Sequence, residues 1–264
     1  MENNNQNLPT IILLAHQDDE IVIMPLIMQA LDAINVHVVF LTSGTHDGSS
    51  SRQRNLESLR NLSYLGVLED NIHFVGSLLA ISDKTLSQHL ELVYQPVVDL
   101  IFKHSIKSIY TMAWEGGHPD HDATHLLGVV IAYRHGLLGQ CRQLPWYNGA
   151  LATRLRPVRL FYPLPTNGYQ LAISVNWRNR CKWLLLALRY PSQWKVLVWL
   201  YPLLLKFVLA SDRVVIQPCS VMRIKERPTA KILRYEQNDF YQYRQFEQDV
   251  AAFLQSYLPE SLND

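Results

Sequence analysis

The chain opens with a buried-strand pattern that runs directly into a cluster of ionisable side chains. Five apolar residues, 11–15, follow a polar, Asn-rich N-terminus and lead into residues 16–20, which read HQDDE. A short apolar run is typical of a buried strand, and open α/β proteins bind ligands at the carboxyl ends of such strands. Three neighbouring carboxylates repel one another unless a positive charge lies among them. The segment therefore predicts a divalent metal at this strand end.

A second group of histidines and carboxylates lies about a hundred residues further along. Residues 118–125 read HPDHDATH and follow another apolar segment, residues 106–113. Zinc is bound by imidazole nitrogen and carboxylate oxygen, and a catalytic zinc takes three protein ligands and keeps one position for water. The first cluster can supply one His and one Asp, and the second cluster can supply another His.

Strand and helix patterns alternate along the N-terminal half. We expect strands over residues 10–15, 36–42, 72–75 and 106–113, and helices over 20–33, 52–65, 85–104 (with a break at Pro96) and 123–133. This alternation predicts an α/β fold, a Rossmann-like and mostly parallel sheet with helices on both faces. Both clusters then lie on loops at the same edge of the sheet.

The second half is less regular. We expect strands over residues 160–162 and 172–175, and helices over 182–188 and 240–257. With 264 residues, 48% of them apolar, the chain suits one domain: a flexible N-terminus over 1–9, and a C-terminal part over 145–264 that shapes a substrate pocket.

Charge and cysteine content exclude several classes of protein. The formal net charge is +1, so there is no global field to attract nucleic acid or an anionic membrane. Three widely spaced cysteines argue against a disulfide framework and against a cysteine zinc site. Residues 1–9 lack the basic and apolar regions of a secretory signal, and we expect a cytoplasmic protein.

Residues 194–210 are strongly apolar and allow two interpretations. Their uncharged core, residues 196–205, is ten residues long, whereas a spanning helix needs roughly 20. The favoured interpretation is a buried core helix that kinks or ends at Pro202. The alternative is an interfacial face, which would place the protein peripherally on a membrane and give it access to a lipid-linked substrate.

The two clusters together resemble the PIG-L/LmbE-like family of zinc-dependent N-acetyl sugar deacetylases. The first motif of that family reads AHPDDE, and residues 15–20 match it with Gln17 in place of proline. The second reads HPDH with a further His four residues on, and it matches residues 118–121 and His125. The substitution at Gln17 changes the stiffness of the loop and removes no ligand.

Two lesser features fit the same family. Arg54 and Glu57 precede an LGV segment at residues 65–67, and residues 190–193 contain a Ser-Gln element. The resemblance covers at least residues 10–130 and extends more weakly to about residue 195.

The resemblance implies roles for individual residues. It implies that Asp18 is the general base, that His118 polarises the reacting carbonyl or protonates the leaving amine, and that Asp120 orients an imidazole. The implied metal ligands are His16, Asp19 and His121. Zinc would lower the pKa of a bound water to roughly 7, which suits amide hydrolysis at neutral pH. Iron(II) accepts the same ligand set.

Three further residues are candidates for substrate contact. Arg54 is expected to bind a phosphate or sugar hydroxyls, or alternatively to pair with Glu57 on the helix surface. Trp114 suits stacking on a sugar ring, although core packing fits the sequence equally well. His125 lies one helical turn after His121, so a substrate-facing role and a buried or solvated position are both open.

The expected function is removal of an N-acetyl group from an amino-sugar conjugate of the N-acetylglucosamine type, either a small molecule or lipid-linked. One alternative keeps the fold and metal but changes the substrate to a non-sugar acylated metabolite. Another is a non-catalytic sugar or nucleotide binder, which the absence of a glycine-rich phosphate loop disfavours.

Overall fold

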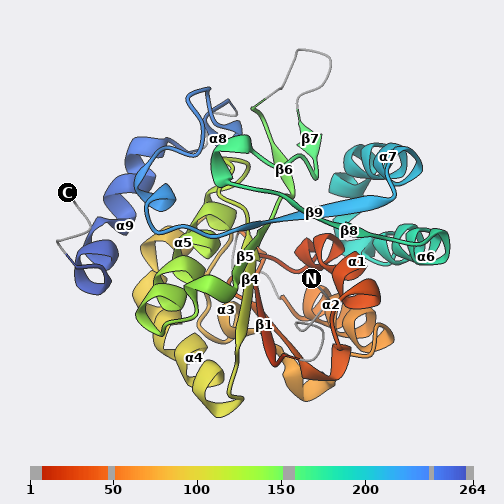
Figure 1. Cartoon of the computed structure of the whole chain (residues 1–264), viewed down its shortest axis with the longest axis horizontal. Coiled ribbons are helices and arrows are strands. Elements are labelled where there is room, and N and C mark those ends of the chain that lie inside the picture. The colour runs from red at the N-terminus through yellow and green to blue at the C-terminus, as the bar shows by residue number, and fades with distance from the viewer. Residues whose placement is uncertain (1–7, 47–50, 151–157, 238–240, 260–264) are drawn as a thin grey trace.

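A computed structural model of the chain describes residues 8–46, 51–150, 158–237 and 241–259. Its centre is a mixed, mostly parallel sheet with the strand order β3-β2-β1-β4-β5-β9-β8 (Figure 1). The strands are β1 (Thr10–Leu14), β2 (Val36–Phe40), β3 (Ile72–His73), β4 (Ser108–Met112), β5 (Cys141–Leu144), β8 (Leu171–Ser174) and β9 (Arg213–Pro218). The predicted α/β class with a mostly parallel sheet is confirmed.

The centre of the sheet is the predicted parallel part. β1 pairs with β2 on one side and with β4 on the other, and every residue of these three strands is buried. Strands buried on both faces read as continuous apolar runs, which is the pattern that residues 11–15 show. Because β1 and β4 are parallel neighbours, the segments that follow them leave the sheet at the same edge.

Helices cover both faces of the sheet, and alternate residues of β1 face the two layers. Ile11 and Leu13 pack in a core with α4 (Leu90–Lys103), α5 (Pro119–Arg134) and α9 (Tyr243–Tyr257). Ile12 and Leu14 pack in a second core with α1 (Met24–Gln29), α2 (Arg52–Tyr64), α6 (Trp177–Ala187) and α7 (Trp194–Ala210). Figure 1 shows the two helical layers on opposite sides of the strands.

Short elements complete the described part of the chain. The small helices are α3 (Val75–Leu78) and α8 (Arg234–Gln237), and a separate two-stranded sheet joins β6 (Tyr147–Asn148) to β7 (Arg159–Leu160). The 3-10 helices are η1 (Asp19–Val22), η2 (Ala33–Asn35), η3 (Glu69–Asn71), η4 (Leu86–Gln88), η5 (Leu138–Gln140), η6 (Pro165–Asn167), η7 (Pro191–Gln193) and η8 (Arg223–Lys225).

Several helices differ from the sequence predictions, two of them at a proline. Pro119 begins α5 with His118 as its N-cap, so the second cluster lies on the first helical turn and not on a loop. Proline fits this position because the first helical N–H has no partner within the helix. Pro96 lies inside α4 without ending it. The helix expected over 20–33 is instead η1 followed by the short α1.

The C-terminal half extends the same sheet with antiparallel strands. β9 runs antiparallel between β5 and β8, and neither β5 nor β9 was predicted. The predictions over 172–175, 182–188 and 240–257 correspond to β8, α6 and α9, with shifted ends. The strand expected over 160–162 is reduced to β7.

The apolar segment 194–210 is one continuous helix, α7, with Pro202 inside it. Only Leu204 and Val208 are fully buried, so the prediction of a buried core helix that kinks or ends at Pro202 is wrong. Pro191–Ala210 is also long and apolar enough to cross a membrane, with a mean hydropathy of 1.3 and 11% of the scored window buried. An exposed apolar helix therefore needs another explanation.

Candidate active site

The two predicted clusters meet at the carboxyl edge of the sheet. His16 follows β1, Asp19 begins η1, and His121 lies in the first turn of α5. One carboxylate oxygen of Asp19 lies 3.1 Å from His121 Nε2, and the other lies 3.3 Å from His16 Nδ1. The topology thus brings together three side chains that are more than a hundred residues apart at their extremes.

These three side chains are suited to a small divalent cation. Donor atoms around a tetrahedral zinc with bonds of ~2.0–2.1 Å are about 3.3 Å apart, and each imidazole lies at about this distance from a different carboxylate oxygen of Asp19. His121 Nδ1 is buried without a hydrogen-bond partner among the described residues. The ligand atoms of His16, His118 and His121 also lie within 4.8 Å of one another, so these three imidazoles form a second set that could hold a metal.

Asp83 belongs to this cluster, although the sequence pattern did not identify it. Its carboxylate lies 3.0 Å from His16 Nε2, 3.5 Å from His118 Nε2 and 2.8 Å from His46 Nε2. Burial alone would raise the pKa of Asp83, but the neighbouring imidazoles hold it well below its usual range. Asp83 lies on the loop between α3 and η4, where no periodic pattern marks it.

Asp120 is fully buried and fixes the orientation of His16. Its Oδ2 lies 3.1 Å from His16 Nε2 and accepts the backbone N–H of Lys84, and its Oδ1 accepts the N–H of Leu86. Burial would lower the pKa of His16, but Asp83, Asp120 and Asp19 raise it well above its usual value. Asp120 thus connects α5, the loop of Asp83 and the imidazole of His16.

His118 caps α5 and faces Asp83. Its Nδ1 accepts the backbone N–H of Asp120 at 3.2 Å, which leaves the proton of the neutral ring on Nε2. Burial, together with the neighbouring His16 and His121, lowers the pKa of His118 well below its usual value. A neutral His118 therefore presents an N–H donor towards the cluster.

Asp18 is held in an unusual backbone conformation beside the cluster. Its φ of 128° lies in a region that L-residues rarely adopt, and strain of this kind is often found at functional sites. Its N–H donates to the buried carboxylate of Glu20 at 2.8 Å. Burial raises the pKa of Asp18 to about 6, although the guanidinium of Arg54 counteracts part of this effect.

Arg54 supports the loop that carries Asp18. It donates to Asp18 Oδ1 at 3.1 Å, to the Gln17 carbonyl at 2.6 Å and to the Gly44 carbonyl. The expected alternative, a pair with Glu57, is not formed, because Glu57 accepts hydrogen bonds from Ser192 and Gln53 instead. The Gln17 amide donates to Thr42 and Asn55, so hydrogen bonds tie the loop down where the family motif has proline.

A cavity of about 1090 Å³ opens over the cluster. Asp18, Asp19, His16, His118, His121, Arg54 and Asp83 line its floor. Its walls are mostly apolar and come from the C-terminal half; they include Trp146, Tyr147, Val196, Trp199, Leu200 and Leu203. The cavity is large enough for a sugar with an attached group.

Two predicted substrate contacts are contradicted by this geometry. Trp114 is fully buried, donates its Nε1 proton to the Glu226 carbonyl and packs on Phe246. His125 is also fully buried; its Nδ1 bonds the Met112 carbonyl, and its ring packs beside Trp114. Both side chains lie in the core and line no part of the cavity, so neither can contact a substrate there.

Glu115 and Tyr147 are site residues that the sequence pattern did not reveal. The Glu115 carboxylate is buried and accepts the backbone N–H groups of Trp146 and Tyr147 and the side-chain amide of Asn148. These bonds fix the segment that places the Tyr147 ring 5.3 Å from the ring of His121. Burial raises the pKa of Glu115 to about 7, and no sequence pattern distinguishes it from a surface acid.

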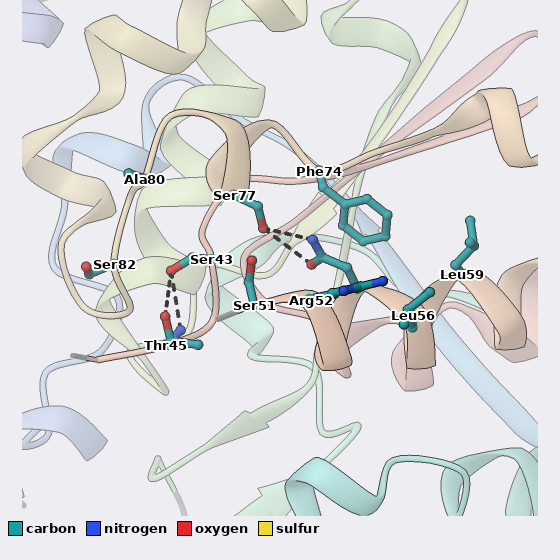
Figure 2. A pocket seen from close by; sticks show the side chains of 11 residues that line it. Ser43, Thr45, Ser51, Arg52, Leu56, Leu59, Phe74, Ser77, Ala80 and Ser82 are labelled. Carbon is teal, nitrogen blue, oxygen red and sulfur yellow. Dashed lines mark hydrogen bonds between the residues drawn. The ribbon is translucent and has the colours of Figure 1, made fainter. Parts of the chain in front are cut away.

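A second cavity, of about 460 Å³, lies beside the loop that follows β2. Ser77 forms hydrogen bonds with the amide of Asn55 along its wall, and Figure 2 shows Ser43 bonded to Thr45. It is lined by hydroxyl and apolar side chains and by Arg52, with no imidazole or carboxylate among its described lining residues. The larger cavity is therefore the candidate active site.

Comparison with known proteins supports this assignment. Residues 11–132 match the family model of PIG-L, described as GlcNAc-PI de-N-acetylase. No curated protein sequence matches the chain.

Three solved structures share the fold. The A40926 pseudoaglycone deacetylase Dbv21 has a TM-score of 0.59 and 16% identity, covering 85% of this chain and 99% of its own. A deacetylase of teicoplanin biosynthesis, solved with teicoplanin, has a TM-score of 0.55 and 16% identity, covering 79% and 97%. The conserved protein TT1542 from Thermus thermophilus has a TM-score of 0.51 and 16% identity, covering 80% and 94%. At such identities, the likeness concerns the fold.

The family match spans both motifs and ends within α5, so it contains β1, β4 and nearly all the side chains of the cluster. On this match, residues 11–132 form a PIG-L family domain, and the resemblance to the PIG-L/LmbE-like deacetylases is confirmed.

Proposed function

We propose that this protein is a metal-dependent hydrolase that removes the N-acetyl group from an amino-sugar conjugate. The match to the PIG-L family supports an N-deacetylase of the amino-sugar type. The observation that carries the proposal of metal-dependent hydrolysis is the convergence of His16, Asp19 and His121 on the floor of a cavity that Asp18 also lines.

In this proposal, His16, Asp19 and His121 hold the metal. A bound zinc would lower the pKa of a water molecule to roughly 7 and polarise the acetyl carbonyl. Two neutral imidazoles and one carboxylate also suit iron(II). One solved neighbour is described as the zinc-inhibited form of the teicoplanin deacetylase Orf2, so excess zinc belongs among the conditions to test.

The remaining side chains handle protons and position the groups that react. Asp18, with its pKa raised to about 6, is ionised at neutral pH and can accept a proton at its carboxylate. Arg54 holds that carboxylate at the cavity floor. His118 Nε2–H can donate to the acetyl oxygen or to the departing nitrogen. Asp83 and Asp120 orient the imidazoles of His118 and His16.

The proposed substrate is an N-acetylglucosamine-type sugar that carries an apolar aglycone. Polar and ionisable residues line the floor of the cavity, and α7 supplies an apolar wall next to them. A sugar bound at the floor would therefore direct its aglycone along α7. We infer a lipid-linked substrate, reached by a cytoplasmic enzyme through peripheral membrane contact at residues 194–210.

The test is acetate release from a panel of N-acetylglucosamine conjugates, with bound metal quantified on the same sample. The panel includes short-chain, long-chain and lipid-linked aglycones, together with acylated amines that lack a sugar. Acetate release that a chelator abolishes and stoichiometric zinc or iron(II) restores is the expected result. Release only from the non-sugar amides would replace the amino-sugar proposal with a general amidase. One bound metal without acetate from any member would refute the proposed reaction.

A further inference from the structure

Negative charge is absent from one long part of the sequence. Residues 123–211 contain no Asp and no Glu, although the whole chain has 23 of them. The same stretch contains 11 of the 24 Lys and Arg residues, so it carries a formal charge of +11 and the rest of the chain carries −10. The overall charge of +1 therefore conceals two parts of opposite sign.

Exposed apolar side chains gather on the two helices within this basic stretch. α6 and α7 pack side by side at one flank of the molecule (Figure 1). Trp199 is 79% exposed and Trp194 60% exposed on α7, and Leu185 is 67% exposed on α6. We call this the α6–α7 surface; its exposed apolar residues are Trp177, Leu185, Leu188, Trp194, Val196, Val198, Trp199, Leu205 and Leu209.

The exposed residues of α7 follow helical spacing. Trp194, Val198, Leu205 and Leu209 are separated by four, seven and four residues, so they project from one side of the helix. An adjoining side packs against the protein through the buried Leu204 and Val208. Since one side is held by the protein core, α7 cannot span a bilayer while the fold is intact, but it can lie along the plane of a membrane surface.

Basic side chains accompany the apolar ones. Lys195 and Lys206 lie on the exposed part of α7, and Arg178 is exposed at the start of α6. Tryptophan together with lysine and arginine is the composition of helices that bind anionic lipid interfaces. An acid anywhere on this surface would oppose such binding, and residues 123–211 supply none.

The same helix also forms a wall of the active-site cavity. Val196, Trp199, Leu200 and Leu203 of α7 line the cavity whose floor carries His16 and the other members of the cluster. A surface bound through α7 would therefore lie beside the opening of that cavity. The α6–α7 surface and the candidate active site are continuous.

We propose that the α6–α7 surface docks on an anionic phospholipid bilayer, with α7 parallel to the membrane plane and the cavity opening towards the lipid. Docking itself rests on the exposed apolar residues and the basic charge. Delivery of a lipid-linked amino sugar into the cavity rests in addition on the proposed function.

The first test measures binding of the full chain to vesicles that contain no amino-sugar lipid. Vesicles of phosphatidylcholine alone are compared with vesicles containing about one third phosphatidylglycerol, by co-sedimentation at low and high salt. Binding should be stronger to the anionic vesicles and should weaken with salt, since each basic side chain near the surface contributes about a fivefold increase in partitioning. Because no substrate is present, this result does not depend on deacetylase activity.

Variants outside the cavity identify the surface. Trp194→Ser combined with Leu209→Ser, and separately Lys206→Glu, should each reduce vesicle binding at least tenfold while leaving acetate release from a water-soluble substrate unchanged. Phe102→Ser is the matched control, because Phe102 is an exposed aromatic residue on α4, in the opposite helical layer. It should bind vesicles as the unaltered protein does.

Three outcomes would overturn the docking proposal. One is no binding to anionic vesicles, and another is binding that the α7 variants and the Phe102 control reduce equally. A third is a stable dimer that becomes monomeric in the Trp194/Leu209 variant, which would make a second copy of the chain the occupant of this surface. Vesicle binding without acetate release from any substrate would instead refute the proposed function and leave docking established.

Discussion

Replacing Asp18 by asparagine should separate catalysis from stability in this site. Asparagine has the shape of aspartate and tolerates a positive φ nearly as well, so the loop can keep its backbone conformation. The bonds from Arg54 to the carbonyls of Gln17 and Gly44 do not involve the Asp18 carboxylate and can remain. The substitution therefore removes one negative charge and one proton acceptor, and little else.

The expected gain in stability follows from the raised pKa. Burial lifts the pKa of Asp18 from 3.8 to about 6, which corresponds to about 3 kcal/mol of folding free energy lost when the group is ionised. The unaltered protein loses this stability as the pH rises from about 4 to about 6. At pH 7, the metal-free Asp18→Asn protein should therefore be more stable by up to about 3 kcal/mol, and the difference should vanish below about pH 4.

Denaturant unfolding of both proteins in the presence of a chelator, from pH 3.5 to pH 8, measures this difference. Asp83→Asn is the matched control of opposite sign. Neighbouring imidazoles hold the pKa of Asp83 below its usual range, so its charge stabilises the fold above about pH 4 and is lost on acidification. Asp83→Asn should accordingly destabilise the metal-free protein at pH 7.

Activity gives the second readout of Asp18→Asn. Loss of a general base should lower kcat by roughly 10²–10⁴-fold, with metal content unchanged, and the acid limb of the unaltered enzyme should lie near pH 6. Acetate release close to that of the unaltered enzyme would remove Asp18 from the mechanism. A variant no more stable than the unaltered protein at pH 7 would show that the Asp18 carboxylate is not desolvated as the structure indicates.

Four further substitutions test the ligand set and the packing of the fold. His121→Ala should lose tightly bound metal, measured by elemental analysis after dialysis; a full equivalent retained would contradict the proposed ligand set. Trp114→Phe should lower the free energy of unfolding by about 1–3 kcal/mol, because it removes a buried hydrogen bond and ring volume. It should leave KM unchanged, and a raised KM would show that Trp114 contacts the substrate. Gly76→Ala should lower the free energy of unfolding by about 3 kcal/mol, since a Cβ there would lie 2.2 Å from the Thr42 backbone nitrogen. Gly136→Ala, which places its Cβ in open space at a φ of +69°, should lower it by about 1 kcal/mol. Equal shifts in melting temperature for the two variants would show that Gly76 is not tightly packed.

The sequence predicts the centre of the site because apolar runs mark where the buried strands end. His16 and Asp19 follow an apolar run, and His121 follows another, so a parallel sheet places all three at one edge. Asp83 could not be found in this way, since its loop follows the two-residue strand β3 and the short helix α3. Its position depends on contacts with His16 and His118 that form only in the folded chain.

The errors at Trp114 and His125 have a different cause. Trp114 lies just before the second cluster and His125 ends it, but a residue close to a ligand in sequence can face either the site or the core. His125 is one helical turn from His121, yet it reaches the Met112 carbonyl. The antiparallel β9 was missed because its position between β5 and β8 depends on pairing with strands distant in sequence.

The strand order has a consequence for how the chain is made. β5 gains its outer neighbour only when β9 has been synthesised, about seventy residues later. Until then, a nascent chain or a truncated fragment that ends shortly after β5 presents an unpaired strand edge, which invites association with other chains. The part that matches the family, residues 11–132, also stops before either strand and before α7. The half that carries the reactive side chains is therefore a poor choice for expression by itself, because strands of the later half cover the edge of its sheet.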